Sequence, residues 1–286
     1  MNSGQRPDDR RRGARIVAGA LAALCSLAAC SVPGVTVQPR YGTSLAVSGS
    51  LDINADEVPP ANERNTVEEI GVGENDGYYG GRVELEMGDL LLSLTTQSSA
   101  HQGAGQLESG ISDGEVVIGE DAFVETDFHF GLHQLQVIYD VVSEDSVTLG
   151  LGLGATSLAF DTGIDEFEEV GDPGEEILVP TGVRLEAASD APVPVLVLRF
   201  AAVLGRFSIA LDLSGMDIDI DGDHLSFMDA GLEGTLWLLP EDSSVHFALL
   251  GGYRYTSIDL TVDTGESTVN ADMSFSGPYI GLGLSF

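Results

Sequence analysis

The chain has 286 residues, and its 46 acidic residues outnumber 12 basic residues, all of them arginine, for a formal net charge of −34. This balance argues against binding to nucleic acid, whose phosphates need a basic face. A hydrophobic content of 43% argues against disorder along the whole chain. No apolar run after residue 29 approaches the roughly 18 residues that a membrane-spanning helix needs.

The first thirty residues have the layout of a secretory signal. Arginines within residues 1–15 precede an uncharged apolar stretch, 16–29, which is too short to span a membrane as a helix. The stretch ends in Leu27-Ala28-Ala29-Cys30, which resembles the processing box of bacterial lipoproteins. The resemblance implies cleavage before Cys30 and a lipid on its thiol. The alternative is an ordinary cleavage site that happens to precede a cysteine.

The residue that follows Cys30 also bears on location. It is Ser31 rather than Asp, and in the lipoprotein resemblance this points to the outer membrane. We therefore expect three regions: a signal peptide over residues 1–29, an acylated tether over 30–43, and a single domain over 44–286.

The predicted domain consists of short alternating runs bounded by Gly, Asp, Ser and Pro, which is typical of an all-β protein. The predicted strands cover residues 44–55, 78–88, 89–98, 126–142, 147–161, 178–188, 193–212, 224–239, 244–262 and 270–286. Short connections (87–89, 143–146, 189–192 and 240–243) alternate with longer ones (56–76, 99–125, 162–176 and 215–223). This layout predicts a single antiparallel up-and-down transmembrane β-barrel of about ten strands, with eight as the alternative.

The two faces of the strands indicate which side meets lipid. In the last strand Ile280, Leu282 and Leu284 share one face, whereas Gly281 and Gly283 lie on the other. We expect the bulky face to point to lipid and the face of small and ionic residues to line the lumen. The GLGLG run at 150–154 is predicted to be a lumenal glycine stripe. In residues 128–141 the alternation changes phase, which predicts a β-bulge near His133 and Gln134; the alternative is a strand boundary other than the predicted one.

The C-terminal strand carries a second resemblance. Apolar residues occupy every second position before Phe286, which resembles the C-terminal recognition signal of Gram-negative outer-membrane proteins. Residues 277–286 and 251–255 also resemble the closing hairpin of small barrels of the OmpA/OmpW-like type. The resemblance implies outer-membrane lipid and the barrel-assembly machinery as partners, with Phe286 as part of the assembly signal.

The predicted lumenal face carries charges of both signs. Because arginine suits bidentate carboxylate pairs where water is scarce, we expect a salt-bridge network that fills the lumen. A charged constriction that selects solutes and acid–base catalysis are the alternatives. The predicted network comprises Arg82, Glu84, Arg184, Glu186, Arg199, Asp229, Glu233 and Arg254.

Two other patterns in the sequence are candidates for functional sites. Asp217, Asp219 and Asp221 match the first half of an EF-hand loop, but the twelfth position is Met228 and strands flank the loop. They are weak metal candidates beside the simpler reading of a solvated acidic hairpin. The chain has five histidines but no Gly-x-Ser-x-Gly elbow, so we expect no catalytic residue, no cofactor and no enzyme activity.

Together these patterns predict an outer-membrane barrel lipoprotein with a structural, envelope or surface-presentation role. The alternatives are a narrow passive channel, an outer-membrane enzyme that modifies lipid or peptide, and a lipid-tethered soluble β-barrel that serves as a binding module.

Overall fold

The computed structural model describes residues 34–42, 45–55, 65–72, 77–112, 116–144, 146–170, 177–220, 223–239, 245–263 and 267–286. The predicted signal peptide, Cys30 and Asp221 lie outside the described residues. No helix in the described part of the chain has the length and apolar content to cross a bilayer.

The described chain is built from β-strands. They are β1 (Gly34–Gly42), β2 (Ala46–Ala55), β3 (Asn65–Thr66), β4 (Tyr78–Met87), β5 (Leu90–Gln106), β6 (Ile111–Ser112), β7 (Val117–Ile118), β8 (Phe123–Glu144), β9 (Val147–Val170), β10 (Ile177–Leu204), β11 (Phe207–Ile220), β12 (Asp223–Trp237), β13 (His246–Asp263) and β14 (Ser267–Ser285).

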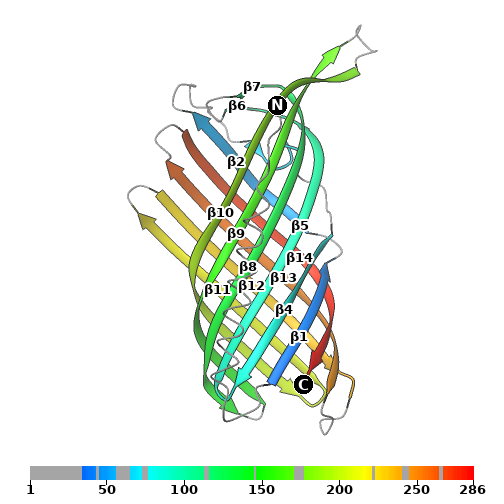
Figure 1. Cartoon of the computed structure of the whole chain (residues 1–286), viewed down its shortest axis with the longest axis vertical. Helices are drawn as coiled ribbons and strands as arrows, with labels where there is room; N and C mark the ends of the chain where they lie inside the picture. The colour runs from blue at the N-terminus through cyan, green and yellow to red at the C-terminus, as the bar shows by residue number, and fades with distance from the viewer. Residues whose placement is uncertain are drawn as a thin grey trace, which may run out of the picture.

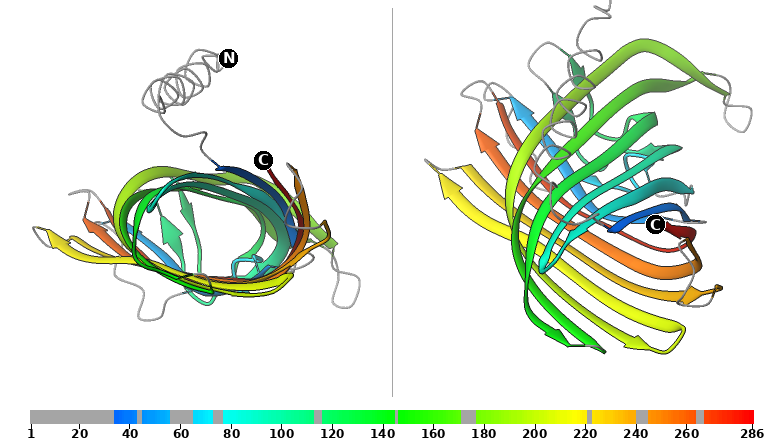
Figure 2. Two further views of the ribbon diagram at one scale, coloured as in Figure 1. Left: turned by 90° about the horizontal axis from the view of Figure 1, so that it is seen from below. Right: turned by 60° about the horizontal axis from the view of Figure 1, so that its bottom comes forward.

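Ten of these strands close into an antiparallel barrel in the order β1-β4-β5-β8-β9-β10-β11-β12-β13-β14, and the pairing of β1 with β14 completes the ring. Viewed from one end, the closed ring is elliptical (Figure 2). The prediction of ten strands is thus confirmed. Closure matters because, at the height where β1 pairs with β14, every strand edge finds backbone partners, which a hydrocarbon environment demands.

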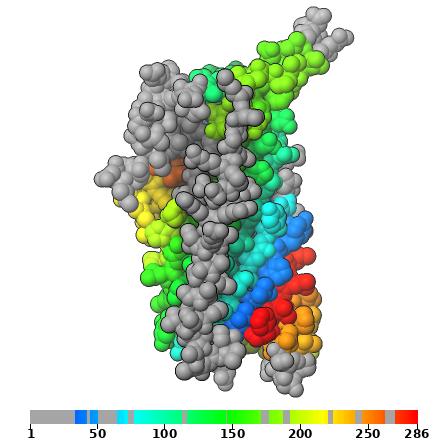
Figure 3. Space-filling view, in the orientation of Figure 1, coloured from blue at the N-terminus to red at the C-terminus, as the bar shows by residue number. Residues whose placement is uncertain are grey.

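The first strand of the ring begins earlier than predicted. Residues 34–42, expected to be part of a tether, form β1, which pairs with both β4 and β14. The space-filling view shows β1 in blue against the end of β14 in red (Figure 3). Past Gly42 the chain continues along β14 as β2, from Ala46 opposite Ser276 to Ala55 opposite Ser267. The tether prediction was wrong here because QPRY was interpreted as linker, although these residues alternate like the other strands.

The two ends of the barrel differ in their connections. At the end that also holds Gly34 and Phe286, β4 joins β5, β8 joins β9, and β10 joins β11 through two residues each, and β12 joins β13 through residues 238–245 (Figure 1). We call this the short-turn end and the opposite one the long-loop end. The predicted turn at 189–192 does not exist, because β10 pairs with β9 through that stretch. The actual turn is at Gly205, whose φ of 65° suits glycine.

Large apolar side chains cover the outside of the barrel near the short-turn end. Ile280, Leu282 and Phe247 are at least half exposed, whereas Arg254 and Glu233 on the inner face are buried. We call the exposed apolar set the belt; it includes Val83, Leu135, Val137, Tyr139, Leu151, Leu153, Leu196, Phe200, Leu211, Leu232, Leu236, Phe247, Leu249, Tyr253, Ile280 and Leu282. Outward apolar and inward polar residues are the pattern of a transmembrane barrel, as the sequence predicted.

Above the belt the same strands reverse this pattern. Along β8 the even-numbered residues face inward from Val124 to Ile138 without interruption. The inward residues change from apolar to polar between Leu132 and Gln134, and the outward ones change from His133 to Leu135. The predicted bulge near His133 is therefore wrong. The inward and outward alternation of the side chains continues through this point, and the outer face passes from lipid to water. The register shift on β8 lies between Asp140 and Val142 instead.

The part of the barrel above the belt holds an apolar core. We call residues 123–133, 157–170 and 177–192 of β8, β9 and β10 the extension (Figure 1). Inside it, the rings of Phe130 and Phe275 stack with centroids 4.1 Å apart, and Phe128 and Phe160 pack beside them. Toward the long-loop end this core continues with buried residues of the 65–72 segment and of the hairpin β6–β7. The upper half of the barrel is thus packed like a soluble protein.

Two polar and conformational features hold the 65–72 segment in place. The Asn65 side chain is fully buried; its Nδ2 donates to Ser109 O over 2.8 Å, and its Oδ1 accepts from Ser109 N over 3.0 Å. Gly71 has φ +81° and lies so close to β5 that a Cβ would be 2.6 Å from Gly103 O. The segment therefore lies directly against the part of β5 that continues past Tyr78, the first residue of β4.

The predicted glycine stripe on β9 lies on the inner face. At Gly152 a Cβ would come within 2.3 Å of Val137 O and 2.9 Å of Ile138 Cα. The stripe therefore lets the inward side chains of the two neighbouring strands lie over β9. Ile138 of β8 and Val195 of β10 occupy the space that side chains on β9 would need.

The reversal of solvent along one strand can be tested by placing the same charge at two heights. Leu151 and Asp161 both point outward from β9, Leu151 in the belt and Asp161 in the extension. We expect Leu151→Arg to lower the free energy of unfolding by about 2–4 kcal/mol, because arginine would enter lipid. Asp161→Arg should change it by about 0.5 kcal/mol or less. Denaturant titration in lipid vesicles measures both; equal losses would contradict the assignment.

Candidate functional site: an ionic network across the lumen

Eight charged side chains from six strands meet inside the barrel at the height of the belt. Each occupies an inward position of its strand, so the alternation of the strands alone directs it into the lumen. We call this set the ionic network; it comprises Arg40 of β1, Arg82 and Glu84 of β4, Arg199 of β10, Asp212 of β11, Asp229 and Glu233 of β12, and Arg254 of β13.

Three ion pairs of the network span the lumen between strands that are not neighbours. Nη1 of Arg82 lies 2.7 Å from Oδ2 of Asp212, and β4 and β11 stand on opposite sides of the ring. Arg199 pairs with Glu84 across the same width. Nη2 of Arg40 lies 2.6 Å from Oε2 of Glu233. These pairs connect strands across the lumen and so fill it at this height.

The pair of Arg254 and Asp229 joins neighbouring strands and is extended by neutral groups. Arg254 donates from Nε to Oδ1 of Asp229 over 2.7 Å and from Nη2 to Oδ2 over 2.9 Å, a bidentate arrangement. Arg254 Nη2 also donates to Oε1 of Gln134 on β8 over 2.7 Å. Thr256 Oγ1 donates to Asp229 over 2.8 Å, and Tyr279 OH donates to Glu233 over 2.9 Å. Most acceptor positions of these carboxylates are thereby satisfied.

The network is electrically balanced and largely buried. Its four arginines match its four carboxylates, and the paired side chains are only 5–16% exposed. Inward side chains of an open pore would be wetted, so this burial means that the groups occupy the lumen themselves. Beside Arg40, Tyr78, Gln97 and Tyr279 a void of about 10 Å³ remains, which is close to the space of one water molecule.

The structure changes the membership of the predicted network at four positions. Arg184 and Glu186 lie on the outer face of the extension, where Arg184 pairs with Asp165 and Glu186 and its side chain is 41% exposed. Their expected lumenal position was wrong because the strand that holds them extends beyond the belt. Arg40 and Asp212 were missed: Arg40 was assigned to the tether, and Asp212 was placed near the end of a strand that actually begins at Phe207. The alternation GRFSIALDL was a usable signal for Asp212.

On the short-turn side of the network the lumen widens into a cavity of about 750 Å³, which we call the vestibule. Its floor includes Glu84, Arg199 and Glu233 of the network. Glu86 and Asp140 add two further carboxylates to its wall, and Trp237 and His246 lie near its rim with ring centroids 6.2 Å apart. The barrel is thus hollow at one end and filled through the network and the apolar core beyond it.

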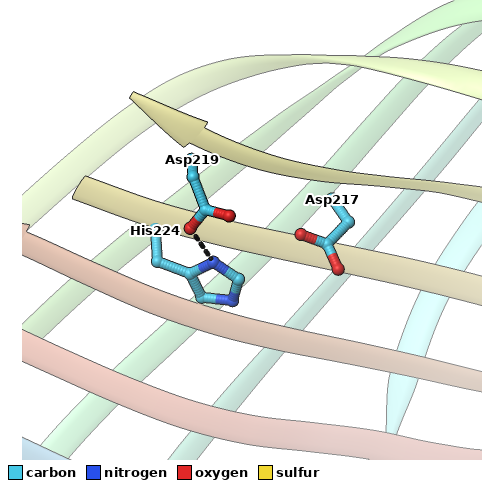
Figure 4. Close-up of side chains that lie close together, drawn as sticks. All are labelled: Asp217, Asp219 and His224. Atoms are coloured by element: carbon cyan, nitrogen blue, oxygen red, sulfur yellow. Dashed lines mark hydrogen bonds and ion pairs between the residues drawn. The ribbon is translucent and has the colours of Figure 1, made fainter. Parts of the chain in front are cut away.

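The acidic hairpin at the long-loop end brings two of the metal candidates together with a histidine. Asp217, Asp219 and His224 offer ligand atoms within 4.8 Å of one another (Figure 4). His224 Nδ1 is 2.8 Å from Oδ1 of Asp219, and this hydrogen bond, helped by the charges of Asp219, Asp217 and Asp259, raises the pKa of His224. Because a metal requires the deprotonated ring, the geometry favours a His–Asp pair over an ion site.

Comparison with known proteins gives likeness of overall form only. No protein-family model matches the chain, and no curated protein sequence matches it. The outer-membrane protein AlkL, solved in lipid bilayers, is similar at 12% identity over 90% of this chain and 92% of that one, with a TM-score of 0.38. The toluene transporter TodX of P. putida has 8% identity over 91% of each chain and a TM-score of 0.31.

A third similar structure is the transport unit of the autotransporter AIDA-I from Escherichia coli, with 8% identity over 89% of this chain and 90% of that one and a TM-score of 0.34. Values this low carry no argument about activity. The assignment of the fold therefore rests on the strand pairing and the faces described above.

A buried pair and an exposed pair of the same type provide a direct test of the network. We expect Asp229→Ala to lower the free energy of unfolding by about 3–5 kcal/mol, because Arg254 is then left buried without its counter-charge. The double change Asp229→Leu and Arg254→Met should recover most of this loss. Asp165→Ala, which removes a partner of the exposed Arg184, should cost about 0–1 kcal/mol. Denaturant titration measures all three; a similar cost for Asp229→Ala and Asp165→Ala would contradict burial of the network.

The pairing of His224 with Asp219 predicts a pH-dependent contribution at the long-loop end. Since the folded pKa is raised, protonated His224 stabilises the fold fully below its ordinary pKa, and the contribution is lost as pH rises through the folded value. Asp219→Asn should lower the pKa of His224 more than Asp259→Asn does, because Asp259 lies 4.0 Å from Nε2. Histidine NMR titration measures both; equal shifts would contradict the hydrogen bond as the main cause.

Proposed function

We propose that this protein is an outer-membrane barrel with a closed lumen whose role is to hold an acidic β-extension above the membrane surface. The role is structural and concerns surface presentation, and it requires no catalytic residue or cofactor. Outer-membrane lipid and the barrel-assembly machinery are its proposed partners.

The observation that carries the proposal is the ionic network. Its pairs join walls on opposite sides of the ring, and the apolar core of Phe130 and Phe275 lies beyond it along the axis. A solute crossing the barrel would have to separate buried ion pairs and then displace a packed core. Both steps are costly, since breaking a buried pair costs about 3–5 kcal/mol. The filled lumen therefore fits a structural role better than the passage of solutes.

The extension supports the second half of the proposal. From residue 157 to residue 170, β9 continues for roughly 45 Å of strand length beyond the belt. The outer face of the extension carries exposed polar residues on β8 and β9, among them Glu125, His129 and Asp161. Near the tip, exposed Glu168 and Glu169 lie beside exposed apolar residues, namely Val170, Ile177 and Leu178. In outer-membrane barrels short turns lie on the periplasmic side, so the extension would stand on the cell surface.

The position of β1 supports lipid attachment at Cys30. Gly34 begins β1 at the short-turn end, where Val35 and Phe286 exchange two backbone hydrogen bonds of 2.9 and 3.0 Å. The four residues from Cys30 to Gly34 reach at most roughly 14 Å. An acyl chain on Cys30 would therefore enter the periplasmic leaflet beside the barrel.

A narrow channel is the second candidate, and the vestibule favours it, because a cavity of about 750 Å³ already opens the path at the short-turn end. Planar-bilayer recordings separate the two. We expect the purified protein to give no stepwise conductance, and the combined change Glu84→Ala, Arg199→Ala and Asp212→Ala to raise the leak, since the widest lumenal pairs are removed. Phe247→Ala on the outer face is the control. Regular steps from the unmodified protein would overturn the closed-lumen proposal in favour of the channel.

Lipid attachment has its own test. Cys30→Ala should abolish an acyl mass increment in the protein extracted from membranes, while the barrel still shows the mobility shift on heating that closed barrels give. An unmodified Cys30 thiol in the natural protein would contradict the anchor without affecting the barrel.

A further inference from the structure

The vestibule has a charge that its own residues do not balance. Glu84 and Glu233 in its floor are matched by arginines of the network. Glu86 and Asp140 form no ion pair among the described residues, and Oδ1 of Asp140 is buried without a hydrogen-bond partner there. Arg199, which lines the same cavity, is already engaged by Glu84 and Asp212. Arg206, also on the wall, sits in an exposed turn.

These two carboxylates line the same cavity, on strands β4 and β8, which lie on either side of β5. Glu86 is opposite Leu91 of β5, and Leu91 is opposite Ile138 of β8, two residues before Asp140. Only the start of β5 separates them. Asp140 is held at this height by its backbone, whose N–H donates to Asp89 O over 2.8 Å. The pair therefore forms a fixed negative patch inside a cavity.

The apolar residues in the rest of the lining favour an organic cation over a metal ion. Leu91 and Val203, at inward positions of β5 and β10, make part of the wall apolar, and the ring of Trp237 is near the rim. A small hydrated metal ion would gain nothing from such a surface. An aliphatic amine would, because its methylene groups can cover the apolar wall while its ammonium groups meet carboxylates or an aromatic face.

We propose that the vestibule is a binding site for a linear aliphatic polyamine, with Glu86 and Asp140 receiving its ammonium groups. This goes beyond the scaffold role, and it does not depend on it, because the site opens to the short-turn end whether or not the lumen conducts.

The chain offers a local reporter, since Trp237 is the one tryptophan of the 286 residues. Spermidine added to the intact barrel in detergent at physiological salt should change the Trp237 fluorescence saturably. The double variant Glu86→Gln and Asp140→Asn should weaken binding at least tenfold. The control variant Glu125→Gln and Asp161→Asn, which removes two exposed acids from the extension, should stay within twofold. Heat-dependent mobility on a gel verifies that each variant is a folded barrel.

Three results would overturn the proposal. The first is no saturable change in fluorescence with spermidine. The second is equal weakening in both double variants, which means that the amine binds only as a counter-ion to the acidic surface. The third is an equal saturable response to magnesium chloride, lost in the vestibule variant, which means that the site takes a metal ion instead.

Discussion

Closure of the backbone ring is the constraint on which the rest of the structure depends. Because β1 pairs with β14, the inward or outward direction of each side chain is decided by its position in the ladder. The strands run without interruption from the belt into the extension, so one alternation has to serve two solvents. The residue types on the two faces are therefore exchanged at the boundary. The inward residue changes from Leu132 in the extension to Gln134 in the belt, and the outward residue changes from His133 to Leu135.

The exclusive use of arginine fits the interior that this creates. In the lumen the guanidinium groups contact carboxylates from two strands at once, as Arg82 does with Asp212 and Glu84 and Arg199 does with the same two partners. A lysine ammonium has no planar fork with which to do this. The surplus of acidic residues is accordingly not in the network, which is neutral, but on the outer surface and in the vestibule. Positive and negative charges are equal in number in the buried network, whereas the excess of carboxylates lies where water can reach it.

The sequence was sufficient for features that depend on alternation and insufficient for those that depend on strand length. The belt face of Leu282 and Phe247 and the inward face of Arg254 were predictable because each strand buries one face consistently. Pro192 misled, since the SDAP segment resembles a turn, whereas β10 passes through it as a strand above the belt. The phase change at His133 was mistaken for a bulge because the prediction assumed one solvent along the strand. Arg184 and Glu186 were misplaced for that same reason.

The behaviour of β10 above the belt follows from these arguments. It pairs with β11 only from Leu196 to Leu204, but with β9 from Ile177 to Ala202, so in the described chain its other edge has no strand partner above Leu196. An open edge invites pairing with another chain, and proline blunts it by removing an N–H. Pro192 and Pro194 stand directly at the start of this edge, and they are tolerated there because the side that lost its donors has no ladder to complete. Pro192 therefore has a structural role: it lets the wall of the barrel divide above the membrane without leaving, at the point of division, an edge that pairs with another chain.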